Sequence, residues 1–177
     1  MSMKKLILEN DAVREYGCLM CYPSEMTQLH FKKFGKSLIP SNIIYTDPND
    51  PSFGYEEDFH VTSKYGFKPD LSKQDISNIL KDIKPFSIKL VGISLFKNAD
   101  FNVVKFDVEL NDTLVKIRSR CDSYPNEDKY PTYHPHATIA YVKPDTFNIT
   151  KNDLNIVIPI TRIKYSSIDG QKLFINL

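Results

Sequence analysis

Alternating side chains from His136 to Val142 predict a β-strand with one polar and one apolar face. Threonine, isoleucine and tyrosine, which favour strands, occupy this stretch, and it contains no glycine. Because successive strand side chains point to opposite faces, His136 and Thr138 share one face, with their Cβ atoms about 7 Å apart. The same order occurs earlier, at His60-Val61-Thr62. The pattern therefore predicts two strands that each present an imidazole beside a hydroxyl.

The remaining pattern predicts further strands and several helices. Ser24, Ser72 with Asp75, and Asn111 are residue types that cap helix N-termini, and Asp169-Gly170 is a strong hairpin signal. The polar residues 1–15 are expected to be weakly structured. We expect strands over residues 16–22, 86–96, 102–110, 155–168 and 171–177, helices over 24–36 and 72–84, and one more helix that starts after residue 111.

Two polar loops, over residues 46–58 and 123–133, each lead into one His-x-Thr strand. Long loops in compact domains are often functional. Each half of the chain also offers a strand, a helix, an acidic loop and a His strand, in a permuted order. This weak internal repeat predicts a single domain over residues 1–177, an α+β fold with a pseudo-symmetric, two-lobed antiparallel sheet.

The composition is that of an ordinary globular protein, and it narrows the choice of partner. The 177 residues are 41% hydrophobic and 25% charged, with a formal net charge of +1. Proteins that bind long nucleic acids usually carry a strong basic bias, so this balance favours a small ligand with a few phosphates. No stretch approaches membrane-spanning length, and Leu6-Ile7-Leu8 is too short for a signal peptide. The three cysteines suit a reducing cytoplasm, and the oligomeric state stays open.

Two His-x-Thr strands lying side by side would suit phosphodiester chemistry. One neutral imidazole takes a proton from the attacking hydroxyl, and the other, protonated, gives one to the leaving oxygen. Both forms coexist near neutrality because the unperturbed pKa of histidine is about 6.5. The two threonines would bind the non-bridging oxygens. The catalytic candidates are therefore His60, Thr62, His136 and Thr138, and we expect no metal and no cofactor, since no ligand cluster surrounds either motif.

The residues alone leave a structural alternative open, in which both histidines are half-buried packing residues. Two such His-x-Ser/Thr pairs arise by chance in roughly one similar sequence in twelve. The apolar strands and the polar loops around both pairs favour the catalytic interpretation.

Cys18 and Cys21 form a C-x-x-C, but on a strand they point to opposite faces and no second pair exists, so we expect them to pack in the core.

Both motifs resemble the paired signatures of the 2H phosphoesterase superfamily, which includes 2′,5′-RNA ligase-like proteins and cyclic nucleotide phosphodiesterases. The stretch from Pro135 to Val142 is a close match, whereas Ser63 and Lys64 replace the usual apolar residues after the first motif. The resemblance covers most of the chain from Tyr16 onward, in element order more than in identity. It implies two lobes of antiparallel strands flanked by helices, with the active site in the groove between them.

Further stretches resemble phage-encoded members of that superfamily, namely Glu15 to Met20, Asp50 to Glu57, and Tyr65-Gly66. Those members degrade the cyclic oligonucleotide messengers of bacterial CBASS immunity. The resemblance implies cleavage of 3′–5′ bonds in a cyclic di- or trinucleotide by attack of the ribose 2′-hydroxyl, in the host cytoplasm. The alternatives are an RNA-end enzyme, which opens 2′,3′-cyclic phosphates or handles 2′–5′ linkages, and a non-catalytic sponge. An intact pair of histidines argues against the sponge.

Three residues are candidates for substrate binding outside the motifs. Tyr22 and Tyr133 are placed to stack on bases, which is a sequence-tolerant interaction. Strict alternation would put Lys64 on the face of His60 and Thr62, within reach of a phosphate. His134 is a weaker candidate because Pro135 follows it, and His30 is expected on the surface.

Overall fold

The computed structural model describes residues 6–10, 15–127 and 132–177 of the chain. Expectations for residues 1–5, 11–14 and 128–131 lie outside the described residues. Among the described residues, no helix is long and apolar enough to cross a membrane. The strands are β1 Leu6–Asn10, β2 Gly17–Pro23, β3 Val61–Phe67, β4 Phe86–Lys97, β5 Asn102–Val108, β6 His136–Val142, β7 Ile156–Ser166 and β8 Gln171–Asn176; the helices are α1 Glu25–Leu38, α2 Lys73–Ile79 and α3 Asp112–Asp122, with a 3-10 turn at Ser41–Ile43.

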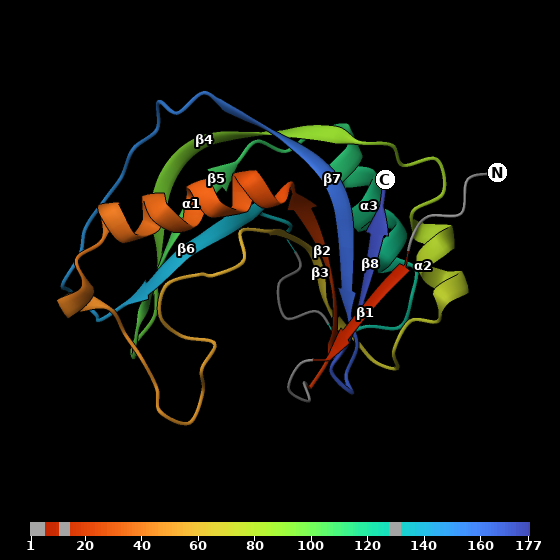
Figure 1. Cartoon of the computed structure of the whole chain (residues 1–177), viewed down its shortest axis with the longest axis horizontal. Helices are drawn as coiled ribbons and strands as arrows, with labels where there is room; N and C mark the ends of the chain where they lie inside the picture. The colour runs from red at the N-terminus through yellow and green to blue at the C-terminus, as the bar shows by residue number, and fades with distance from the viewer. Residues whose placement is uncertain (1–5, 11–14, 128–131) are drawn as a thin grey trace.

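The long strand β7 joins two parts of one antiparallel sheet (Figure 1). Its first half pairs with β4, and its second half lies between β2 and β8. One lobe therefore runs β3-β2-β7-β8-β1, and the other runs β7-β4-β5-β6. This arrangement confirms the two-lobed antiparallel sheet of an α+β fold. It also corrects one expectation, because residues 6–10 of the lead-in form β1 and pair with β8.

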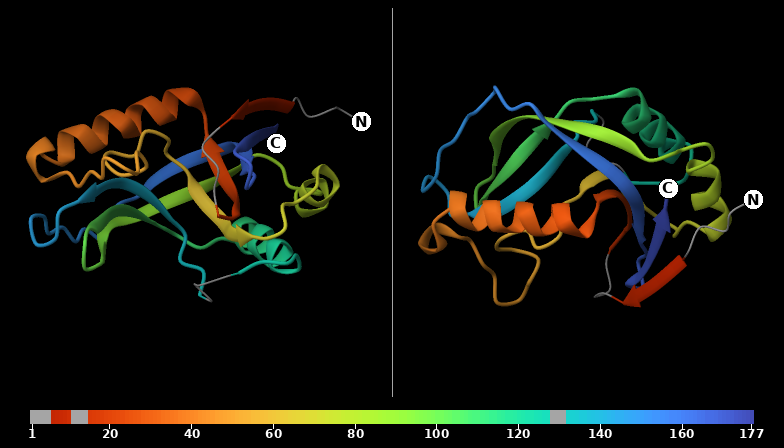
Figure 2. Two further views of the ribbon diagram at one scale, coloured as in Figure 1. Left: turned by 90° about the horizontal axis from the view of Figure 1, so that it is seen from below. Right: turned by 45° about the horizontal axis from the view of Figure 1, so that its top comes forward.

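Each lobe buries one sheet face against helices (Figure 2). In the second lobe, α1 packs on β6 so closely that a Cβ at Gly35 would lie 3.1 Å from the Ile139 side chain. Phe31 of the same helix stacks on Phe59, with ring centroids 4.2 Å apart. In the first lobe, α3 contacts β3, and α2 contacts α3. The apolar residues of the strands face these helices, so the opposite faces are left for polar residues.

The predicted helix starts are confirmed by the hydrogen bonds of their caps. The Ser24 hydroxyl accepts from the Thr27 amide, Asn111 accepts from Leu114, and Ser72 with Asp75 forms a complete capping box. Helix α2 ends at Ile79 rather than near residue 84. Asp82 soon after it has a φ of 60°, a left-handed conformation that an α-helix does not accommodate.

The loop ahead of the first motif pairs with the free edge of β6. Tyr55 forms a bridge with Ala140, the Tyr141 amide donates to the Gly54 carbonyl over 2.8 Å, and the Glu56 amide donates to the Ile139 carbonyl over 2.9 Å. The Tyr55 hydroxyl donates to the Ile39 carbonyl over 2.6 Å and fixes this segment from its other side. The loop therefore runs antiparallel to β6 and covers an edge that would otherwise expose unpaired amides.

Replacing Ile139 with alanine should destabilise the second lobe, because Ile139 fills the contact between β6 and α1. We expect Ile139→Ala to lower the free energy of unfolding by about 2–4 kcal/mol, as for other buried large-to-small changes. Val115→Ala, at an exposed position of α3, is the matched control and should change it little. Urea unfolding measures both, and equal effects would contradict the packing described.

Candidate active site

Both motifs place their histidine and threonine on the polar face of a lobe. Val61, Ala137 and Ile139 are buried in the core, whereas His60, Thr62, His136 and Thr138 alternate with them and are partly exposed. His136 begins β6, and His60 directly precedes β3. The predicted pairing of one imidazole and one hydroxyl on each face is therefore present in both lobes.

The pairing of the loop with β6 brings the two histidines together. Tyr55 lies opposite Ala140, so the antiparallel register carries the chain from Glu56 toward His60 while β6 runs back from Ile139 toward His136. Strands β3 and β6 contact each other although β2, β7, β4 and β5 separate them along the sheet. A protonated His60 is close enough to lower the pKa of His136. The two imidazoles therefore form one site.

The backbone fixes both imidazoles in the same way. His60 Nδ1 lies 2.6 Å from the Asp58 carbonyl oxygen, and His136 Nδ1 lies 2.9 Å from the His134 carbonyl oxygen. A carbonyl oxygen only accepts, so Nδ1 is the protonated nitrogen in both rings. This bond leaves Nε2 of each ring able to accept or donate a proton.

An aromatic ring packs against each imidazole. Tyr22 stacks on His60 with ring centroids 5.4 Å apart and an interplanar angle of 13°. Phe96 meets His136 edge-on, at 4.9 Å and 86°. The two histidines therefore have equivalent backbone bonds but different neighbours.

The pKa of His136 lies below its ordinary value, and burial is the main cause. The bond to the His134 carbonyl opposes this shift, the charges of Lys105 and His60 add to it, and the Asp107 carboxylate opposes it. His136 is therefore neutral near pH 7, which is the form that a general base needs.

The two predicted tyrosines lie at the site, but as supports of the motifs. Tyr22 is only 3% exposed and its ring covers His60. The Tyr133 hydroxyl donates to the Thr62 carbonyl oxygen over 3.2 Å, and its ring lies 5.3 Å from the Arg118 guanidinium. These contacts hold His60 and Thr62 in place from two sides.

Lys64 does not share the face of His60 and Thr62, and the expectation from strict alternation is corrected here. Met20 pairs with Thr62 and Leu19 pairs with Lys64, so Ser63 is an extra residue that forms a β-bulge. The bulge turns Lys64 toward α3, where its ammonium lies 2.7 Å from Asp122 and only 1% of the residue is exposed. Ser63 contacts Cys21, with Oγ and Sγ 3.2 Å apart.

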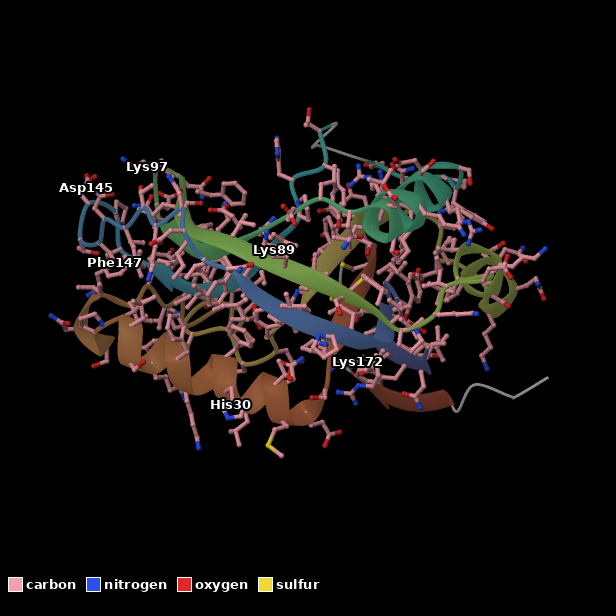
Figure 3. The ribbon with its side chains drawn as sticks, turned by 90° about the horizontal axis from the view of Figure 1, so that it is seen from above. His30, Lys89, Lys97, Asp145, Phe147 and Lys172 are labelled. Carbon is pink, nitrogen blue, oxygen red and sulfur yellow. The ribbon has the colours of Figure 1, made fainter. Side chains whose placement is uncertain are left out.

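The side chains of the other histidines and of the cysteines take no part in the pairing of His60 and His136. His134 contributes its carbonyl oxygen, and its side chain is exposed. His30 points outward from α1 (Figure 3). Cys18 and Cys21 are buried on opposite faces of β2, as expected, and burial raises the pKa of the Cys21 thiol to about 12. No group of three or more potential metal ligands occurs among the described residues.

Sequence reasoning missed four residues that surround the histidines, namely Phe96, Lys105, Asp107 and Lys164. Lys105 lies directly across from Thr138, and Asp107 lies directly across from His136. Lys164 is 3.1 Å from the Tyr22 hydroxyl. The available signal was a lysine within an apolar strand, as in Val104-Lys105-Phe106 and Ile163-Lys164-Tyr165.

A separate cavity lies between α2 and the β7–β8 hairpin. It holds about 210 Å³ and is lined by residues such as Asp70, Ile76 and Tyr165. Neither histidine lines it, and the carboxylate of Asp70 is already bonded to the Tyr165 hydroxyl and the Ile168 amide. The paired histidines therefore lie outside this cavity.

Solved structures with the same fold cover nearly the whole chain. It is similar to TT0787 of Thermus thermophilus, with 14% identity and a TM-score of 0.61 over 92% of this chain and 97% of that one. It is similar to E. coli LigT complexed with 3′-AMP, with 12% identity and a TM-score of 0.61 over 92% and 94% of the two chains. It is also similar to Usb1 of Kluyveromyces marxianus, with 10% identity and a TM-score of 0.55 over 93% of this chain and 99% of that one.

Comparison with curated protein sequences finds no match. The model of the 2′-5′ RNA ligase superfamily matches residues 42–155, which are more than half of the chain and include both His-x-Thr motifs. This match confirms the resemblance to the 2H phosphoesterases at the level of the superfamily. With its paired motifs on the two lobes of this fold, the chain belongs to the 2′-5′ RNA ligase superfamily.

Proposed function

We propose that the protein is a metal-independent phosphodiesterase that cleaves 3′–5′ bonds of ribonucleotides. The observation that carries this proposal is the paired histidine geometry: each Nδ1 donates to a backbone carbonyl, which leaves both Nε2 atoms for proton transfer. Acid and base of this kind each contribute about 10²–10⁴ to the rate of a proton-transfer reaction.

In the proposed mechanism His136 is the base and His60 is the acid. Nε2 of His136 removes the proton from a ribose 2′-hydroxyl, and the 2′-oxygen forms a bond to phosphorus. The bond from phosphorus to the 5′-oxygen breaks, and His60 gives its Nε2 proton to that oxygen. The products are a 2′,3′-cyclic phosphate and a free 5′-hydroxyl. Burial and the neighbouring Lys105 charge, which keep His136 neutral, support this division of roles.

Thr62 and Thr138 bind the non-bridging oxygens in this proposal. Both hydroxyls lie on the same face as the imidazole two residues earlier, and both residues are partly exposed. Tyr22 and Tyr133 both contact the first motif, and Tyr22 is only 3% exposed, so stacking on a base is proposed for Tyr133 and not for Tyr22.

The proposed substrate is a cyclic di- or trinucleotide, and the proposed role is the evasion of CBASS immunity by a phage in the host cytoplasm. The similarity of residues 15–20, 50–57 and 65–66 to phage-encoded members supports this choice. The net charge of +1 fits a small phosphorylated ligand. The second candidate is an RNA-end enzyme, which the crystal structure of LigT with 3′-AMP favours, because that fold accommodates a nucleoside 3′-phosphate.

Removing either imidazole should abolish turnover while the fold persists, because acid and base act as a unit. We expect His60→Ala and His136→Ala each to lose activity on a cyclic dinucleotide, and Thr62→Ala or Thr138→Ala to lose about 10²-fold. His30→Ala, on the outer side of α1, is the matched control and should keep its activity. Chromatographic assays of product measure this, and a His60 or His136 variant near the wild-type rate would refute the mechanism.

The pH dependence of kcat/KM should be bell-shaped, with its acidic limb set by His136. Because the pKa of His136 is lowered, the base stays deprotonated until the pH falls below about 6.5, the ordinary value of histidine. The activity should therefore persist under mildly acidic conditions and be lost only below that pH. A profile whose acidic limb lies above the ordinary value would assign the base to another group.

A substrate without 2′-hydroxyls separates the internal nucleophile from water. If the 2′-hydroxyl attacks, a fully 2′-deoxy cyclic dinucleotide has no nucleophile and should survive, since bulk water cannot match the effective molarity of the neighbouring group. The ribose form should be cleaved and should pass through a species one water lighter than the final linear product. Mass spectrometry distinguishes the two, and similar rates for both substrates would show that water attacks.

A further inference from the structure

An aromatic ring packs against each motif histidine, and a buried lysine contacts that ring. In the first lobe, Tyr22 stacks on His60, and the Lys164 ammonium donates to the Tyr22 hydroxyl over 3.1 Å. The same ammonium lies 5.1 Å from the centroid of the Tyr22 ring. Lys164 is only 4% exposed, so water screens its charge much less than that of a surface lysine.

The second lobe repeats this arrangement with residues from different strands. Phe96 of β4 packs edge-on against His136, and the Lys105 ammonium lies over the Phe96 ring, 4.3 Å from its centroid. Lys105 also donates to Ser94 Oγ over 2.8 Å and is 6% exposed. A cation at this distance from a ring face is attracted by the ring's quadrupole, more strongly when water is excluded.

Each lysine also pairs with an aspartate beside its histidine. Lys164 lies 3.6 Å from the Asp58 carboxylate, and the Asp58 carbonyl oxygen accepts the Nδ1 proton of His60. Lys105 forms an ion pair with Asp107, which lies directly across from His136 on the neighbouring strand. In both lobes, therefore, a buried lysine contacts an aromatic ring and an aspartate that lie beside the histidine.

Burying two ammonium groups in strands is costly, and apolar side chains would fill the same positions at a lower cost. The neighbours of the two lysines in the chain, Val104, Phe106, Ile163 and Tyr165, point to the opposite face of the sheet and pack in the apolar core. The two charges lie beside the two histidines, and each one orders a ring and a carboxylate there. Fold stability alone does not account for this placement.

We propose that Lys105 and Lys164 are positioning residues, each fixing one imidazole through the aromatic ring and the aspartate beside it. This inference rests on the proposed function for its effect on turnover. Lys105 acts in addition on the charge state of His136, since the charges of Lys105, Asp107 and His60 are among the main causes of the His136 pKa shift. Lys164 belongs to the opposite lobe, where it contacts Tyr22 and Asp58.

The test that needs no substrate is an NMR titration of the four histidines, with His136 assigned through the His136→Ala variant. Lys105→Met removes a charge that lowers the pKa of His136 and leaves Asp107 without its ion pair, so both changes should raise that pKa. Asp107→Asn keeps the shape and removes a charge that raises the pKa, so it should lower it. Lys164→Met is the matched comparison, a buried lysine removed from the other lobe, and should shift the His136 titration less than Lys105→Met does.

The kinetic test compares kcat with KM on a ribose cyclic dinucleotide. Lys105→Met and Lys164→Met should each lower kcat by about tenfold or more, with KM little changed, as expected when a reacting group is misplaced by a fraction of an ångström. Lys105→Arg keeps the charge and should recover much of the loss. Lys105→Met should move the acidic limb of the pH profile toward higher pH, and farther than Lys164→Met does.

Several outcomes would overturn the inference. One is a His136 titration that stays at the wild-type position in both Lys105→Met and Asp107→Asn, and another is an equal shift in Lys164→Met. A loss of kcat that follows the melting temperature of the variants, without any change in the pH profile, would show that the lysines only stabilise the fold. If no cyclic nucleotide is cleaved, the proposed substrate is wrong, and the titration still decides the role of Lys105.

Discussion

The pairing of residues 54–56 with the edge of β6 is the interaction on which the site depends. Along the sheet, β3 and β6 lie at opposite ends, and β2, β7, β4 and β5 separate them. The bridge between Tyr55 and Ala140 and the two backbone hydrogen bonds that flank it hold the segment before β3 against the edge of β6. The short segment after Glu56 then places His60 beside His136. An unpaired strand edge could pair with another chain, and here the same edge binds the loop that brings the two motifs together.

The long strand β7 belongs to both lobes and fixes how one is placed relative to the other. Because its first half pairs with β4 and its second half with β2 and β8, the two lobes are parts of one continuous sheet. Helices α1 and α3 cover one face of each lobe and fill the space behind the motifs with apolar side chains. The polar faces that remain carry the imidazoles, the hydroxyls and the buried lysines.

The pseudo-symmetry of the site is chemical as well as topological, but it is incomplete. Both Nδ1 atoms donate to the carbonyl two residues earlier, both rings lie against an aromatic residue, and both have a buried lysine with an aspartate nearby. The difference lies in geometry, since Tyr22 stacks on His60 whereas Phe96 meets His136 edge-on and Asp107 lies across from it. Two identical environments would give both histidines the same proton affinity, and a reaction that needs an acid and a base requires them to differ.

The sequence by itself determined the local features of this protein. Strand alternation placed each histidine and threonine on one face, capping residues located the helix starts, and Asp169-Gly170 marked the last hairpin. These signals are local because they depend on the period of the backbone and on neighbours a few residues away. Only the tertiary structure decided which side chains surround the histidines. Lys105 and Lys164 reach them across strand pairings, Ser63 forms a bulge that turns Lys64 toward Asp122, and residues 6–10 become a strand because β8 offers an edge. Such contacts join residues far apart in the chain, and no local period encodes them.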